Sequence, residues 1–174
     1  RVDEEVSLYL DNKTSFPYGA KTDTETGEIL LKRDMQFGII DPHISSVTGV
    51  NVFNLFTRLT FKDGTRGYLI KEYEVGEIVD SFSLSFYNDE GFSYVADAQG
   101  NILIRPPHPN SNKTVKNLFD MIHMTHNDTE SVEKFRRSLE SASTGWAVFE
   151  YQEESTVFCY TPLNLQTDWY LISI

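Results

Sequence analysis

The stretch that most constrains the fold of this chain is Gly91–Ile104, GFSYVADAQGNILI. It predicts an apolar strand, a tight turn at Asp97–Gly100 and a second apolar strand. Further apolar stretches near the end of the sequence predict the strands Trp146–Tyr151, Thr156–Leu163 and Asp168–Ile174. Strands in this order form an antiparallel sheet, which suits the holding of a small molecule against a sheet face better than it suits catalysis.

Composition supports a folded domain and excludes several partners. The chain has 174 residues, of which 40% are hydrophobic, so one domain with a sizeable core is expected. The formal net charge of -11 argues against nucleic acid and anionic lipid as partners, because both require clustered Lys and Arg. No stretch approaches the ~20 apolar residues of a membrane span. The single cysteine, Cys159, lies in an apolar strand and is expected to be buried and inert.

Other elements are predicted around this hairpin. Val50–Phe61 and Gly67–Tyr73 flank an Asp63-Gly64 turn, which predicts a second hairpin. Apolar residues at helical spacing predict helices over Glu74–Leu84, from Thr114 onward, and over Ser131–Ser141. The fold class is therefore expected to be α+β, with a central antiparallel sheet flanked by helices.

The chain is expected to form one domain overall. Residues 1–44 are predicted to be a helix stub over residues 1–12 and a polar lead-in segment, and residues 45–174 the folded core. The sequence starts without Met and ends inside an apolar strand, which predicts that it was excised from a longer protein.

The core resembles the Cache family of PAS-like sensor domains over roughly residues 45–174. Gly91–Ile104 is similar to the family's Gly-aromatic-x-x-Val-x-Asp-x-x-Gly-x-Ile-Leu hairpin. The other matching segments are Ser46–Gly49, Lys62–Gly64, Asn117-Leu118, Gly145, Tyr160–Leu163 and Asp168–Leu171. Asp168 stands where the family usually has Gly, and the Tyr-Arg-Trp set of the amino-acid-binding branch is absent, so amino-acid specificity is not carried over.

The resemblance implies an extracytoplasmic, non-catalytic sensor domain, on the periplasmic or extracellular side of a membrane receptor. Such a domain binds a small molecule and passes a displacement through the membrane to a histidine kinase, a diguanylate cyclase or a chemotaxis module. No cofactor and no metal are expected from the residues, and the resemblance is compatible with a homodimer formed through the N-terminal helix.

A pocket wall is predicted on one face of the strand Val50–Phe61. Val50, Val52, Asn54, Phe56 and Arg58 place polar groups among apolar neighbours there, and Arg58 is a candidate clamp for a carboxylate. A water-exposed strand end remains the alternative for Arg58. The opposite face, with Phe53, Leu55, Leu59 and Phe61, is expected to be a plain core face.

Strand tyrosines and one further arginine complete the predicted ligand-binding set. Arg105 ends the hairpin just before Pro106, where it either faces the pocket or caps the strand. The tyrosines can reach a ligand with their hydroxyls, or serve as core aromatics with a polar tip: Tyr68, Tyr94, Tyr151 and Tyr160.

Three rival functions stay open at this stage. A cytoplasmic haem- or flavin-binding PAS domain needs an axial histidine, for which His123 is the only candidate. A small hydrolase lacks any nucleophile signature in this sequence. The alternative with most weight is a ligand-free PAS-like interaction or dimerisation module, whose pocket is filled by side chains. Asp120, His123 and His126 drift around a helix without a fourth ligand, so no zinc site is predicted.

Overall fold

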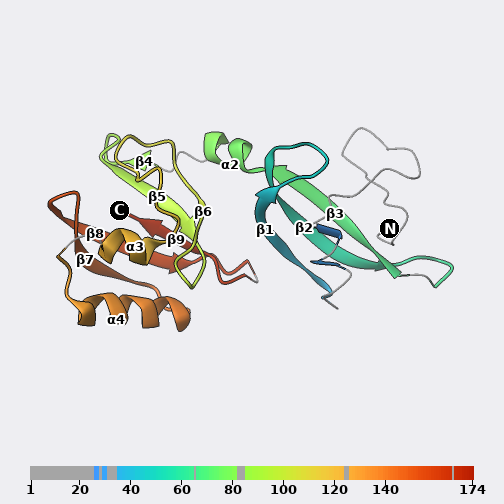
Figure 1. Cartoon of the computed structure of the whole chain (residues 1–174). Coiled ribbons are helices and arrows are strands. Elements are labelled where there is room, and N and C mark those ends of the chain that lie inside the picture. The colour runs from blue at the N-terminus through green and yellow to red at the C-terminus, as the bar shows by residue number, and fades with distance from the viewer. Residues whose placement is uncertain are drawn as a thin grey trace. The chain divides into compact units, whose positions relative to one another are not determined.

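A computed structural model describes residues 26–27, 29–30, 35–64, 66–81, 85–123, 126–165 and 167–174 of the chain (Figure 1). The helix predicted for residues 1–12 lies outside these residues. The chain divides into two compact units, Arg1–Ile78 and Val79–Ile174, each with its own antiparallel sheet. The single domain expected over residues 45–174 stays a prediction.

The first unit contains a three-stranded antiparallel sheet of β1 (Phe37–Ile44), β2 (Asn51–Thr60) and β3 (Arg66–Glu74), in that order. The predicted β2–β3 hairpin is confirmed, and Gly64 closes its turn with φ of 82°. The register between β1 and β2 shifts between Ile40 and His43. Pro42 lies at this irregularity, where a residue without an N–H is tolerated. A short helix, α2 (Val75–Ser81), follows β3 as predicted.

The second unit contains a six-stranded sheet with strand order β4-β5-β9-β8-β7, in which β6 pairs with β5. Its strands are β4 (Ser85–Phe86), β5 (Gly91–Ala96), β6 (Ile102–Ile104), β7 (Gly145–Tyr151), β8 (Glu154–Pro162) and β9 (Tyr170–Ser173). The predicted central hairpin and the closing strands are therefore confirmed. The last strand of the chain lies in the middle of the sheet, and β7 lies at its edge.

Two helices, α3 (Leu118–His123) and α4 (Thr129–Glu140), pack against β7. The prediction that a helix starts at Thr114 was wrong. The side-chain oxygen of Asn112 accepts hydrogen bonds from the N–H groups of Thr114 and Val115, which holds this segment in a turn. The helix begins only at Leu118, where the Asn117 oxygen accepts from the Phe119 N–H at 2.8 Å.

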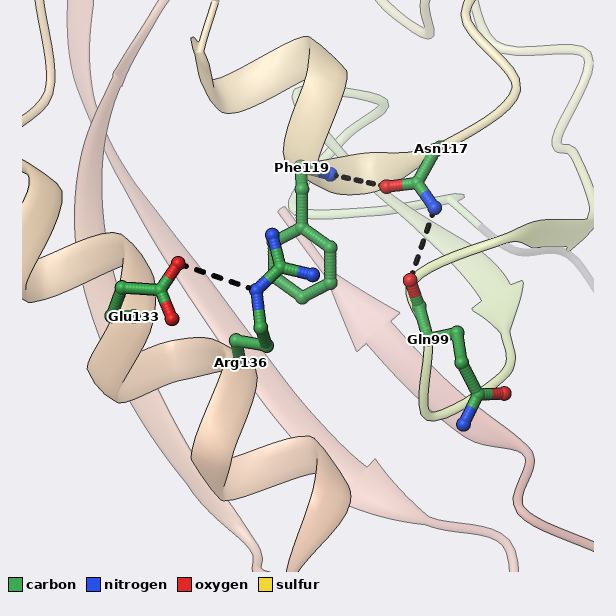
Figure 2. Close-up of polar contacts among 5 residues, drawn as sticks. All are labelled: Gln99, Asn117, Phe119, Glu133 and Arg136. Carbon is green, nitrogen blue, oxygen red and sulfur yellow. Dashed lines mark hydrogen bonds and ion pairs between the residues drawn. The ribbon is translucent and has the colours of Figure 1, made fainter.

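The core of the second unit is largely aromatic. Val132, Phe135 and Leu139 form the buried stripe of α4, and the Phe135 ring lies 5.5 Å from Phe149 and 5.7 Å from Phe119. Figure 2 shows the Arg136 guanidinium over the Phe119 ring, at 3.9 Å from the ring centroid. The Asn117 amide donates to the Gln99 carbonyl at 3.0 Å, as Figure 2 also shows. These contacts link the β5–β6 turn to α3, and α3 to α4.

The start of α4 gives a pH-dependent prediction. Hydrogen bonds from the side chain and main chain of Ser131 lower the pKa of the Asp128 carboxyl, which caps the helix. The stabilisation by this carboxylate is present above its unfolded pKa of about 3.9 and is lost as the pH falls through the lower folded pKa. We expect Asp128→Ala to unfold at a lower temperature than wild type at neutral pH, with a smaller difference in acid. Asp128→Asn keeps a cap that does not titrate, and an Asp128→Ala difference that stays constant with pH would contradict this origin.

Candidate functional site

The seven residues predicted to bind a ligand fall into two groups. Asn54, Arg58 and Tyr68 lie in the first unit, on β2 and β3. The second unit contains the other four: Tyr94, Arg105, Tyr151 and Tyr160.

The burial of the two faces of β2 is the reverse of what was predicted for its core face. Phe53, Leu55, Leu59 and Phe61 were expected to form a core face, but Phe53 is only half-buried and the other three are each 37–38% exposed. The opposite face is the buried one, because Phe56 on that face packs into a core with Leu30 and Ile40. The face predicted to be a pocket wall therefore points inward, and it carries the polar side chain of Asn54 into the interior.

Asn54 is fully buried and belongs to a small polar cluster with Thr26 and His43. Its side-chain nitrogen donates to the Thr26 hydroxyl at 2.8 Å, and the Nε2 atom of His43 lies 3.5 Å from the same hydroxyl. The Nδ1 atom of His43 lies 2.8 Å from the Asp41 carbonyl, so Nδ1 carries the proton and Nε2 faces Thr26. The Oδ1 atom of Asn54 has no hydrogen-bond partner among the described residues. A buried acceptor of this kind costs about 1–3 kcal/mol, so it marks a place where a donor is missing.

The surroundings of Asn54 are charged as well as polar. Glu72 on β3 lies directly opposite Asn54 in the strand register, and such pairs share a sheet face with Cβ atoms about 5 Å apart. Farther along β2, the Arg58 guanidinium donates to the Tyr68 hydroxyl at 3.3 Å and lies 5.7 Å from the Tyr68 ring centroid. The same sheet face therefore carries the Asn54 Oδ1 acceptor, the Glu72 carboxylate and the half-buried Arg58.

In the second unit, three of the predicted side chains converge on the loop between β6 and α3. The Tyr94 hydroxyl accepts from the Asn112 N–H at 2.8 Å, and the Tyr151 hydroxyl donates to the Asn110 carbonyl at 2.9 Å. Arg105 donates to the main-chain carbonyls of Asn112 and Val115. The polar tips of this cluster are thus bound to the chain's own main chain.

Burial of this cluster predicts a loss of stability at alkaline pH. Burial raises the pKa of the Tyr151 and Tyr94 hydroxyls, and the proximity of Tyr94 raises that of Tyr151 further. A raised folded pKa stabilises the protein below the unfolded pKa of about 10, and this stabilisation is lost as the pH rises through the folded value. We therefore expect Tyr151→Phe to lose less stability than wild type as the pH rises above about 10. Urea midpoints measured over this rise in pH check it, and identical pH slopes would argue against the tyrosine.

Tyr160 lies apart from the loop cluster. Its ring packs 5.2 Å from Phe135, and it lines a hollow beside α4. Cys159 directly precedes Tyr160 on β8 and is exposed, so the expectation of a buried thiol was wrong. Its side chain points to the sheet face opposite the aromatic core, because successive residues of a strand face opposite sides. Within the described residues, no three metal-binding side chains are grouped to hold an ion.

Sequence reasoning did not select Thr26, His43 or Glu72. His43 directly follows Pro42 and belongs to no motif, and Thr26 lies in a turn-rich segment without a motif. Only the strand register, which places Glu72 opposite Asn54, and the pairing of Thr26 with Asn54 over 28 positions reveal the cluster. No local signal in the sequence identifies it.

Comparison with known proteins gives matches in structure only. No family model matches the chain, and no curated protein matches it by sequence. The ligand-binding domain of the Pseudomonas aeruginosa chemoreceptor PctB, solved with L-Gln, matches with a TM-score of 0.61 at 14% identity, over 98% of this chain and 66% of that one. The domain of the Pseudomonas fluorescens chemoreceptor CtaA, solved with L-isoleucine, matches with a TM-score of 0.58 at 16% identity, over 85% and 55%.

A third match comes from a different class of receptor. The extracellular domain of mmHK1S-Z3, described as a histidine kinase, has a TM-score of 0.57 at 15% identity, over 79% of this chain and 48% of that one. The chain thus spans about half the length of the first structures that it matches. Identities this low establish the architecture alone. The chain has the α+β fold of Cache-type sensor domains, the fold of these ligand-binding domains of chemoreceptors and of this extracellular domain of a histidine kinase.

Proposed function

We propose that this chain is the small-molecule-sensing part of a membrane receptor and lies outside the cytoplasmic membrane. The observation that carries the proposal is its fold, which is that of ligand-binding domains from chemoreceptors and of the extracellular domain of a histidine kinase. None of the helices that the structure describes is long and apolar enough to cross a membrane. In this proposal the chain itself is non-catalytic, and a kinase, cyclase or chemotaxis module elsewhere in the receptor reads its state.

We propose the Asn54 cluster as the ligand site. The unpartnered Oδ1 atom of Asn54 calls for a hydrogen-bond donor, and the carboxylate of Glu72 in the opposite register position favours a cationic one. A primary amine has both properties. Arg58, on the same strand face, is the proposed clamp for a carboxylate on the same ligand. The CtaA and PctB domains were solved with amino acids, which have both groups, so amino acids head the candidates.

In this proposal, the ligand signals by shifting the populations of two arrangements of the chain. A ligand changes the balance between two arrangements only by its difference in affinity for them. A ligand that donates a hydrogen bond to the Oδ1 atom of Asn54 removes the free-energy cost of this unsatisfied buried acceptor. It therefore stabilises the arrangement in which β2 and β3 enclose the ligand. Because α2 directly follows β3 in the chain, a small displacement of β3 is passed to the segment that leads into the second unit.

Thermal unfolding in the presence of matched compounds tests the proposal. L-leucine, L-serine and propylamine contain an amine, whereas propionate contains only the carboxylate and glycerol only hydroxyls. A compound that binds the folded state at about one hundred times its Kd stabilises it by about 2.7 kcal/mol. We expect the amines to raise the unfolding midpoint with increasing concentration. A response to propionate alone would assign the site to an arginine instead.

A ligand-free interaction module is the second candidate, and one observation favours it. Tyr94, Arg105 and Tyr151 in the second unit are all bound to the loop main chain, so their polar groups are already occupied. If amino acids, amines, carboxylates and polyols all leave the midpoint unchanged, this candidate replaces the sensor.

A further inference from the structure

Strand β7 forms an open edge of the six-stranded sheet. It pairs with β8 on one side, through the two-residue turn at Gln152 and Glu153. On its other side, the main chain of Glu150 is closed by the side chain of Asn127. The Asn127 oxygen accepts from the Glu150 N–H at 2.8 Å, and its nitrogen donates to the Glu150 carbonyl at 3.1 Å. The amide of Asn127 thus takes the place of a neighbouring strand at this one residue.

The same side of β7 is unpaired at Trp146 and Val148. Main-chain groups of alternate residues in a strand point to the same side, so the N–H and C=O groups of these residues point the same way as those of Glu150. Within the described part of the chain they have no partner on that side. Trp146 is 70% exposed and Val148 45% exposed, without the charges or prolines that normally protect an edge.

A groove runs along this edge, between β7 and α4. It has a volume of about 550 Å³, and its lining includes Phe135 and Tyr160 from the core side and Ser131 and Lys134 from α4. Lys134 is exposed, and no carboxylate of the described residues lies within ion-pairing distance of it. On the opposite face of the strand, Val148 pairs with the exposed Val157 of β8 and extends the apolar surface around Trp146. We refer to this combination as the α4–β7 groove.

We propose that the α4–β7 groove binds a short extended segment of a partner protein, which adds as a strand to β7. The main-chain groups of Trp146 and Val148 supply the hydrogen bonds, as in other cases of strand addition. Alternate side chains of the segment then cover Trp146 and Val148 or point into the groove. The uncompensated Lys134 selects an acidic side chain on the groove side, and Asn127 stops the pairing at Glu150.

A designed peptide tests this proposal independently of the ligand site. We would titrate acetylated, amidated Val-Glu-Val-Thr-Val into the protein and follow the main-chain amides of Trp146 and Val148 by NMR. We expect both amides to shift and saturate at millimolar peptide. A peptide with the central valine N-methylated on its pairing edge should abolish both shifts, and the Val148→Pro variant, which has no amide at position 148, should abolish the shift of the Trp146 amide. Proline is tolerated at an edge position whose N–H faces away from the sheet, and the midpoint of Val148→Pro verifies its folding.

Charge and self-association provide the decisive controls. Val-Lys-Val-Thr-Val should bind wild type roughly two- to fivefold more weakly, the effect of one exposed ion pair, and Lys134→Glu should reverse this preference. Equal binding of the N-methylated peptide, or no shift at millimolar peptide, would overturn the proposal. The proposal would also be overturned if sedimentation showed a dimer and the NMR signals of the Trp146 and Val148 amides broadened on dimer formation without peptide. In that case a second copy of the chain occupies the groove. Asn54→Leu leaves this binding unchanged, so the two proposals fail separately.

Discussion

Replacing Gly100 with alanine is expected to lower the free energy of unfolding by about 2–5 kcal/mol. Gly100 closes the β5–β6 turn with φ of 81°, a conformation that costs an L-residue about 1–2 kcal/mol. A Cβ atom there would lie 2.6 Å from the Phe119 ring. That ring already contacts Phe135 and Arg136, so a shift of the ring disturbs both contacts, and overpacking adds about 1–3 kcal/mol. Urea denaturation followed by circular dichroism measures the loss.

Gly64→Ala is the matched control for this prediction. Gly64 has nearly the same φ of 82°, yet no atom lies within 4 Å of its Cβ position. Its replacement should therefore cost only the conformational part, about 1–2 kcal/mol. If the two variants lose equal stability, the close contact between Gly100 and the Phe119 ring does not add to the cost of the substitution. The packing of α3 against the central hairpin then depends on other contacts.

The same turn illustrates which parts of the fold can be predicted. A tight turn was expected at Asp97–Gly100, and the Asp97 carboxylate organises it by accepting from the N–H groups of Gln99 and Asn101 at 3.0 and 2.8 Å. This chemistry is local, within four positions, so the sequence contains all of it. Both hairpins and the closing strands are predictable for the same reason: alternation and turn residues decide them.

What could not be predicted depends on contacts distant in sequence. Both faces of β2 are rich in apolar residues, so alternation alone cannot say which one is covered, and the packing of Leu30 and Ile40 on Phe56 decides it. The same holds for Asn54, whose partner Thr26 lies on another segment. For the loop tyrosines, the sequence predicted polar tips in an apolar setting, but not that the loop main chain binds them.

Asn54→Leu is expected to separate ligand binding from stability. Leucine has a similar volume and removes the unpartnered acceptor together with one hydrogen bond to Thr26, so the free energy of unfolding should stay within about 1 kcal/mol of wild type. Affinity for the amine that raises the wild-type midpoint most should fall about tenfold to hundredfold, because a hydrogen bond to a charged group contributes about 1.5–3 kcal/mol. Calorimetric titration of both proteins measures the ratio.

Tyr94→Phe is the control for the Asn54 prediction, because it removes a buried hydroxyl from the second unit and leaves Asn54 intact. It should keep wild-type affinity for the amine. Unchanged affinity in Asn54→Leu, with lost affinity in Tyr94→Phe, would move the ligand site to the loop cluster of Tyr94, Arg105 and Tyr151. The ligand would then have to displace main-chain hydrogen bonds that are already formed, whereas at Asn54 it supplies one that is missing. This difference in cost is the physical reason for placing the site in the first unit.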